Sequence, residues 1–274
     1  MNVIVLKLGG SVITDKNVEN SIKWGVLKRI GNEIKSALQH LSGNTKLIIV
    51  HGGGSFGHPL ASKFKRIKGY YDSEAFIAIR ENMNTLASII SLLLSCLGLK
   101  ASHFQSSSLF ILNKGRIVKA FLDPITYSLE NDIIPILYGD IAVDLSRGYD
   151  ILSGDSIVAY LANYYNAIKI LYATDVDGVY TDNPKVNPLA KRIERIIIVK
   201  SSIDGKYTIS TRVKGDIIPH MDVTGGIYRK ILDLAQYARR DLIAYIFNGL
   251  IEGNIFRAII NKPEECTVVE VKMR

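Results

Sequence analysis

Short apolar runs alternate along this chain with longer segments in which apolar residues recur every three or four positions. The short runs predict strands, and the longer segments predict amphipathic helices. We expect strands at 3–8, 46–50, 101–104, 133–137, 167–173, 196–199, 207–209, 242–247 and 268–271. We expect helices at 22–41, 73–97, 154–165 and 226–239, with hairpin turns around 113–116 and 204–205.

Several of the expected strands, such as 47–50, contain no polar residue. Strands of that kind are typical of parallel sheets whose two faces are both covered by helices. The pattern therefore predicts an α/β fold, a three-layer αβα sandwich around a mostly parallel open sheet. The sequence changes character near Asp150, so we expect two lobes of one continuous domain, 1–150 and 151–274. Ligands should bind where the strands end.

Two of the expected strands run directly into glycine-rich turns, at Gly9-Gly10-Ser11 and at 52–58, which reads GGGSFGH. Glycines let the backbone come close to a bulky anion with N–H groups pointing at it. A helix that begins just after such a turn adds a positive partial charge. His58 can donate a further hydrogen bond to the same anion. Two such turns indicate two phosphate sites, and hence a phosphoryl donor and an acceptor.

The chain has 274 residues, of which 47% are hydrophobic and 22% are charged, so it can bury a substantial core. Its formal net charge is +8. One interpretation is a basic surface for nucleic acid, and the other is a lysine-rich solvated surface around sites for anionic small molecules. The basic residues are scattered and form no long run, which favours small anionic ligands and no nucleic-acid partner.

Cys96 and Cys266 are the only two cysteines, so neither metal spacing nor a disulfide framework is present, and a reducing, cytoplasmic compartment fits. We expect Cys96 to lie in the core. The first apolar run is short and carries Lys7, unlike a secretory signal. The most apolar segment, 86–99, is too short to span a membrane and contains serines, so we interpret it as a buried helix without a membrane partner.

Gly52, Gly54 and Gly57 match the GxGxxG dinucleotide fingerprint. A dinucleotide fold also needs a strand that ends in an acidic residue about twenty positions later. That region instead holds Asp72 and Glu74 at the start of a long helix, which disfavours a dinucleotide-dependent oxidoreductase. The sequence has no Walker A motif and no protein-kinase HRD or DFG motif. Any use of ATP must therefore rely on another fold.

Three lysines are candidates for phosphate chemistry. Lys7 ends a strand beside the first glycine turn, where it can neutralise a phosphate, although a lysine there can also simply extend to solvent. Lys16, taken alone, reads as a solvated loop lysine. Lys230 follows Gly225-Gly226 at an expected helix start, which suits either an anion or ordinary capping with a surface lysine.

Two acidic residues are further candidates. Asp155 follows Ser153, a possible N-cap, so its carboxylate can either cap the first helical turn or orient lysines in the cleft. Asp175 begins an acid-rich loop after a strand, suited to a turn, a ribose contact or a metal.

Five motifs, in this order along nearly the whole chain, resemble the amino acid kinase superfamily. They are KLGGS at 7–11, HGGGSFGH at 51–58, SGD at 153–155, TDVDGVY at 174–180 and GG at 225–226. Within the superfamily the chain is most similar to archaeal-type isopentenyl phosphate kinases, through KLGGSVITDK at 7–16 and the terminal histidine of HGGGSFGH. The resemblance implies the amino acid kinase fold, with Mg-ATP phosphorylating isopentenyl phosphate to isopentenyl diphosphate in the archaeal variant of the mevalonate pathway.

The resemblance also implies roles for individual residues. His58 would bind the acceptor phosphate, Lys7 and Lys16 the migrating phosphoryl group, and Lys230 the ATP phosphates, while Asp155 would orient the lysines. The acceptor site would include Gly53, Gly57 and His58, and the ATP site Lys7, Gly9, Gly10, Ser11, Gly54, Asp175, Gly225, Gly226 and Lys230. The acceptor would thus sit in the 1–150 lobe and ATP in the 151–274 lobe. We expect no protein metal ligands, with Mg²⁺ held by ATP and water.

An acceptor with a prenyl tail needs an apolar wall. Phe76, Ile79 and Met83 lie three or four positions apart on the helix expected at 73–97 and can form one apolar stripe. Plain core packing explains this spacing equally well. We hypothesise that Phe76 and Met83 contact the tail.

Alternative functions remain open at this point. Another kinase of the superfamily, acting on fosfomycin, UMP or a carboxylate, shares much of the pattern. A non-catalytic nucleotide-binding regulatory protein is a rival of another class, disfavoured by the presence of all five candidate catalytic residues. Because superfamily members commonly associate through the N-terminal lobe, we expect a homodimer.

Overall fold

The computed structural model describes residues 1–184, 186–213, 216–219 and 226–274. Its main feature is a ten-stranded sheet in the order β14-β13-β12-β16-β15-β9-β1-β2-β6-β3. Six neighbouring strands run parallel: β3 (Ala101–His103), β6 (Ile134–Tyr138), β2 (Thr45–His51), β1 (Asn2–Leu8), β9 (Lys169–Thr174) and β15 (Leu242–Asn248). The other four lie at one side and pair antiparallel, except for the parallel pair β12–β16: β16 (Cys266–Met273), β12 (Arg195–Lys200), β13 (Tyr207–Val213) and β14 (Asp216–Pro219).

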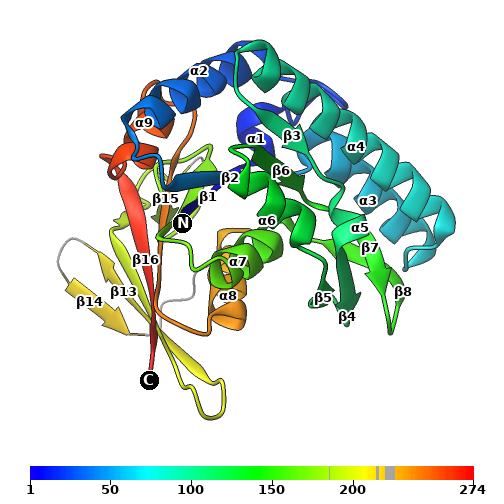
Figure 1. Cartoon of the computed structure of the whole chain (residues 1–274). Coiled ribbons are helices and arrows are strands. Elements are labelled where there is room, and N and C mark those ends of the chain that lie inside the picture. The colour runs from blue at the N-terminus through cyan, green and yellow to red at the C-terminus, as the bar shows by residue number, and fades with distance from the viewer. Residues whose placement is uncertain (185, 214–215, 220–225) are drawn as a thin grey trace.

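Helices cover both faces of the sheet, which gives the three layers (Figure 1). One face packs against α2 (Trp24–His40), α3 (Gly54–Lys68), α4 (Ser73–Cys96) and α9 (Asn254–Ile260). The other face packs against α6 (Asp123–Glu130), α7 (Gly154–Tyr164) and α8 (Gly226–Tyr237). Two short helices, α1 (Gly10–Ile13) and α5 (Ser106–Leu109), lie near strand ends.

Two smaller sheets extend this framework. A four-stranded sheet has the order β5-β4-β7-β8 and consists of β4 (Phe110–Asn113), β5 (Arg116–Ala120), β7 (Asp140–Asp144) and β8 (Gly148–Leu152). A two-stranded sheet pairs β10 (Val179–Tyr180) with β11 (Arg192–Ile193). The four-stranded sheet lies beside α3 and α4 in Figure 1, and its β8 reaches the cavity described below.

The apolar core divides into two clusters, one on each face of the sheet. Along β1, Ile4, Leu6 and Leu8 belong to the cluster under α2, α4 and α9, while Val3 and Val5 belong to the cluster under α7 and α8. Because strand side chains alternate between faces, Lys7 shares the face of Val3 and Val5. The alternation therefore directs Lys7 toward α7.

The strand β1 lies at the centre of the sheet and joins the two parts of the chain. It pairs in parallel with β2 on one side and with β9 on the other, and Lys7 lies between Val50 and Tyr172 in this register. The carboxyl ends of β1, β2, β6 and β9 consequently meet at one edge, where open α/β sheets bind ligands.

The expected strands, helices and both hairpin turns are confirmed, with end points shifted by a few residues. A helix, α3, does begin in the second glycine turn. The pattern did not predict the β7–β8 hairpin, α6 or α9. These elements are short, and helices of about two turns leave too few positions to show a helical period.

The expectation that Cys96 is a core residue is wrong, because its thiol is exposed. Leu86, Ile90 and Leu94 are the buried positions of this part of α4. Cys96 follows Leu94 by two positions, which places it on the opposite side of the helix.

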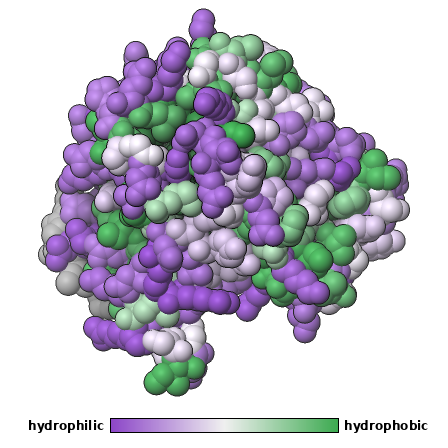
Figure 2. Space-filling view, in the orientation of Figure 1, coloured by the Kyte–Doolittle hydropathy of each residue, from purple (hydrophilic) through white to green (hydrophobic). Residues whose placement is uncertain are grey.

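Hydrophilic side chains spread over the whole face seen in Figure 2, and apolar side chains occur between them in separate groups. Among the described residues, no helix has the combination of length and apolar character that crossing a bilayer requires.

Candidate active site

A cavity of about 540 Å³ lies at the edge where β1, β2, β6 and β9 end. It is lined by the glycine turns after β1 and β2, the first residues of α7, Lys230 of α8 and the face of α4 that carries Ile79 and Met83. Of the predicted site residues whose surroundings the structure describes, all except Phe76 line this cavity. Gly226 begins α8, and Gly225 lies outside the described residues.

The two glycine turns lie back to back. A Cβ atom on Gly52 would lie 2.8 Å from the backbone nitrogen of Gly10, and a Cβ on Gly10 would collide with the backbone of Gly54. Gly54 also has a φ of +49°, a left-handed conformation that glycine adopts without strain. Only glycines permit this contact, which explains why both turns contain them.

Thr14, a residue that the sequence analysis did not single out, ties the two turns together. Its buried hydroxyl donates to the carbonyl of Gly10 at 2.7 Å and accepts from the N–H of Ser55 at 3.0 Å. Ser55 is in the first turn of α3, where N–H groups lack acceptors within the helix. The N–H groups at the start of α3 thus lie at the cavity wall together with the positive end of the helix.

A buried cluster of three charges forms one wall of the cavity. One carboxylate oxygen of Asp155 accepts a hydrogen bond from Lys7, and the other lies 3.1 Å from the Nζ of Lys230. The exposed fractions of these side chains are only 8% for Lys7, 11% for Asp155 and 15% for Lys230. Asp155 therefore orients the two lysines, while the side chain of Ser153 caps the helix through the Asp155 N–H.

The net charge of this cluster is positive, and burial makes its protonation sensitive to its surroundings. Burial lowers the pKa of Lys7 to about 8, although Asp155 acts in the opposite direction. Burial acts to raise the pKa of Asp155, but Lys7 and Lys230 outweigh burial and hold this pKa below its ordinary value. At pH 7 Lys7 therefore keeps its positive charge and Asp155 its negative charge, and two lysines beside one carboxylate suit an anionic ligand.

A second, more open cluster lies across the cavity. Asp175 accepts from the hydroxyl of Ser11 at 3.0 Å and lies 3.4 Å from the Nζ of Lys16. The Lys16 side chain is 63% exposed, so it can reorient toward a ligand at low energetic cost. The interpretation of Lys16 as a lysine surrounded only by solvent does not hold, because it faces the cavity beside Asp175.

His58 lies on the α3 wall of the cavity, one residue after Gly57. Partial burial, followed by the positive charges of Lys7 and Lys16, lowers its pKa below the ordinary value. The imidazole is therefore neutral at pH 7, with one N–H group available to donate.

The far end of the cavity is apolar. Ile79 and Met83 of α4 and Ile151 of β8 line it, and Met83 packs so closely on Gly57 that a Cβ there would lie 2.8 Å from its sulfur. Phe76, which was predicted to join this wall, instead stacks on Tyr149 with ring centroids 4.7 Å apart. Ile151 was not among the predicted site residues, because its strand β8 was not expected.

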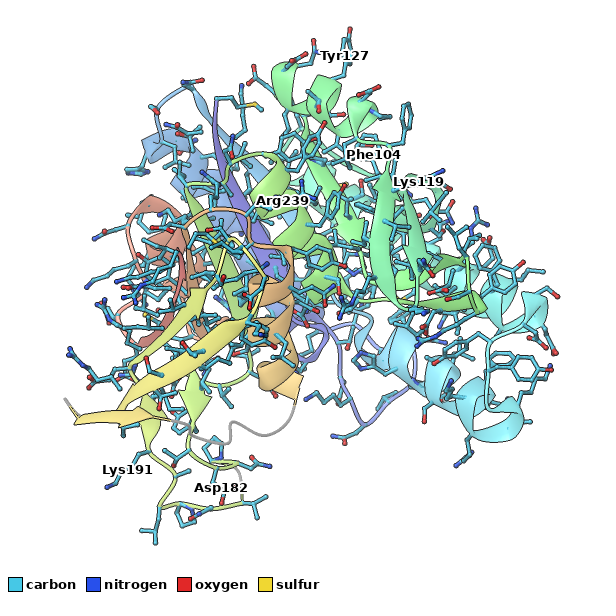
Figure 3. The ribbon with its side chains drawn as sticks, turned by 90° about the horizontal axis from the view of Figure 1, so that it is seen from below. Phe104, Lys119, Tyr127, Asp182, Lys191 and Arg239 are labelled. Carbon is cyan, nitrogen blue, oxygen red and sulfur yellow. The ribbon has the colours of Figure 1, made fainter. Side chains whose placement is uncertain are left out.

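The acidic loop after β9 divides between two environments. Asp175 lines the cavity, whereas Asp177 accepts from Asn248 and from Tyr180. Asp182 accepts from the side chain of Asn187 and, with Lys191, lies at the tip of the segment that carries β10 and β11 (Figure 3). Most of these acids thus form turns. Within the described ranges, no three His, Cys, Asp or Glu side chains gather as a metal-binding group.

A sequence model described as the amino acid kinase family matches residues 2–248. The chain is 39% identical to the isopentenyl phosphate kinase of Methanocaldococcus jannaschii over 95% of this chain and 96% of that protein. It is 34% identical to the isopentenyl phosphate kinase of Methanothermobacter thermautotrophicus over 98% and 100% of the two chains. A crystal structure of isopentenyl phosphate kinase aligns with a TM-score of 0.78 and 30% identity, over 98% of this chain and 100% of that one. The two buried lysines that face two glycine turns agree with these similarities, which extend over nearly the whole chain. The chain therefore belongs to the amino acid kinase family and, within it, to the isopentenyl phosphate kinases.

Proposed function

We propose that this protein transfers the γ-phosphoryl group of ATP to isopentenyl phosphate, giving isopentenyl diphosphate and ADP. The observation that carries this proposal is the buried Lys7–Asp155–Lys230 cluster facing the back-to-back glycine turns, with an apolar pocket beyond His58. Two phosphate-sized anions fit opposite such groups, and the apolar end suits a hydrocarbon tail.

In this proposal, the protein acts mainly by positioning and by charge neutralisation, which is what phosphoryl transfer requires. The acceptor is an ionised phosphate, so no general base has to activate it. Lys7 and Lys16 would neutralise the migrating group, Lys230 the ATP phosphates, and the N–H groups of Gly53 and Gly54 would lie between donor and acceptor. Asp155 would keep two of these lysines oriented before substrates arrive.

Mg²⁺ fits this site as a companion of ATP. The carboxylate of Asp175 is engaged by Ser11 and Lys16, which leaves ATP oxygens and water as the proposed main ligands. When bound, the ion would neutralise charge on the phosphates and reduce repulsion between the two substrates.

The proposal also covers the roles of the two lobes and the oligomeric state. Residues 1–150 would hold the acceptor and 151–274 the nucleotide, on one continuous sheet. We further expect a homodimer, which sedimentation equilibrium measures directly.

A coupled ADP-release assay tests the function. The highest kcat/KM is expected for isopentenyl phosphate when it is compared with fosfomycin, UMP and acetylglutamate. A higher kcat/KM for one of the others would assign a different kinase activity, and no ADP release with any of them would indicate a regulatory protein.

His58→Ala is expected to raise the KM for isopentenyl phosphate and lower kcat/KM by roughly 10- to 100-fold, because a hydrogen bond to a charged group is lost. The KM for ATP should change by less than about twofold, since the neutral imidazole is proposed to contact only the acceptor. The exposed His40 on α2 provides a matched control as His40→Ala. Kinetics of His58→Ala that equal those of the control would contradict the acceptor role.

The pH dependence should follow Lys7. Its pKa of about 8 in the free protein means that kcat/KM should fall as the pH rises through about 8, because the group loses the charge that attracts phosphate. Bound ATP adds negative charge nearby, so the corresponding limb of kcat should lie at higher pH. Rate profiles from pH 6 to 10 measure both limbs, and a flat kcat/KM profile across this range would refute the assignment.

Met83→Ala is expected to raise the ratio of kcat/KM for geranyl phosphate over isopentenyl phosphate by roughly tenfold, since it enlarges the apolar end of the cavity. Phe76→Ala should change that ratio less, because Phe76 stacks on Tyr149 and does not line the cavity. An unchanged ratio in Met83→Ala would argue against contact with the tail.

A further inference from the structure

A second cavity, of about 430 Å³, shares Ile151 with the candidate active site. Four cationic side chains line it: Lys65 of α3, Lys114 and Arg116 of the β4–β5 hairpin, and Arg147 of the β7–β8 turn. Two carboxylates, those of Asp150 and Asp233, also line it. Four positive charges against two negative ones leave this cavity with an excess of two positive charges. Ile151 lines both cavities.

The carboxylates are already engaged. Asp150 forms an ion pair with Arg147, and Asp233 accepts from the hydroxyl of Ser156 at 3.0 Å. Among the described residues, no ion pair is formed by Lys65, Lys114 or Arg116. Lys65 lies 5.4 Å from the ring centre of Tyr71, also in the cavity wall. Among the described residues, three of the four cations around this cavity are thus not ion-paired with a carboxylate.

A buried carboxylate fixes the two turns that carry these cations. Asp144 accepts hydrogen bonds from the backbone N–H groups of Lys114, Gly115, Ser146 and Arg147. Burial acts to raise the pKa of Asp144, but these hydrogen bonds hold it at about 2. One carboxylate therefore binds the backbones of both Lys114 and Arg147, so that the two turns that carry these cations are held side by side before any ligand binds.

Lys114 also has an unusual backbone. Lys114 and Gly115 form the two-residue β4–β5 turn with φ values of +53° and +76°. Such turns favour Asn-Gly, and a lysine with positive φ is uncommon. Lys114 thus occupies a backbone conformation that is unfavourable for lysine, and its charge adds to the repulsion among the neighbouring cations. Departures of this kind are more typical of functional than of structural positions.

We propose that this cavity binds a diphosphate group. An anion with more than one negative charge offsets the excess positive charge, and its several oxygens can accept from Lys114, Arg116 and Lys65 together. The concave shape and limited volume suit a small ion or head group better than an extended polymer. The aromatic and apolar walls at Tyr71 and Ile151 can also contact a hydrocarbon chain attached to it.

Isothermal titration calorimetry with inorganic pyrophosphate tests this site. The candidate active site also attracts phosphates, so the wild-type chain should show two classes of binding site. Lys114→Met combined with Arg116→Met should weaken one class at least tenfold and leave the other unchanged. A matched control removes two positive charges that lie outside the cavity, on elements that also carry lining residues: Lys63→Met on α3 and Lys119→Met on β5 (Figure 3). This control should retain both classes of binding site.

Further ligands identify the source of the diphosphate. The relevant sites are those whose binding the double variant weakens. If geranyl diphosphate binds to them more tightly than pyrophosphate, their ligand is a prenyl diphosphate. If the two affinities are equal, their ligand is the free pyrophosphate ion. Either result supports the proposal. The proposal would be overturned if the wild type and the Lys114/Arg116 variant bound pyrophosphate equally. It would also be overturned if the control variant lost the same pyrophosphate affinity, or if orthophosphate bound as tightly as pyrophosphate. None of these outcomes depends on the proposed kinase activity.

Discussion

Lys7→Met is expected to lower kcat by about 10³-fold while the protein remains folded. Removing a single preorganised group that stabilises transition-state charge typically costs 10²–10³-fold, and Lys7 is a buried one. Methionine fills similar space without charge, and Asp155 keeps Lys230 as a partner at 3.1 Å. The melting temperature should therefore change little. Steady-state ADP release and circular dichroism melting measure the two quantities.

The matched control is Lys46→Met. Lys46 belongs to the neighbouring strand β2, at the opposite end of the sheet, where it pairs with the exposed Asp132. This change should leave kcat within about twofold of the wild-type value, because its ion pair is remote from the cavity. If Lys7→Met retained more than a tenth of wild-type kcat, the proposed role in phosphoryl transfer would be wrong.

Asp155→Asn is expected to lower the free energy of unfolding by about 3 kcal/mol, because it removes the carboxylate with which both buried ammonium groups pair. It should also lower the pKa of Lys7 below about 8, since the carboxylate that favours its charged form is gone. Activity at pH 7 should then fall with stability. Urea denaturation gives the free energy, and the alkaline limb of kcat/KM should move to lower pH.

A double-variant cycle separates charge from shape. Adding Lys7→Met to Asp155→Asn removes one of the unpaired charges and should recover part of the lost stability. Additive losses in the double variant would mean that Asp155 supports the fold through packing and hydrogen bonds rather than through the lysines.

Local physics was sufficient to predict the part of the site that depends on strand ends. Parallel strands share their carboxyl edge, so two strands followed by glycine turns place these turns together, and alternation along β1 directs Lys7 away from Leu6 and Leu8. Helix starts after the turns were predictable from the same pattern.

Contacts between distant segments could not be predicted in this way. Asp155 is 148 residues from Lys7 and 75 from Lys230. The residue pattern alone left open whether Asp155 caps its helix or orients lysines, and only the family resemblance favoured the second role. The spacing of Phe76 and Met83 indicates one helix face, but their different surroundings depend on Tyr149 and Ile151 of β8, a strand that the pattern did not predict. Thr14 belongs to the KLGGSVITDK motif, but its residue type does not predict that its hydroxyl bridges the two glycine turns.

The central position of β1 also has a consequence for the newborn chain. On the ribosome, β1 and β2 emerge long before β9, so one edge of the strand that bears Lys7 stays without its neighbour until Lys169–Thr174 has been made. Such an edge invites pairing with the wrong partner, and a topology with so many distant pairings matures slowly. A nascent polypeptide that ends before β9 should therefore depend on chaperone protection, and its ability to hold nucleotide should appear only at the close of synthesis.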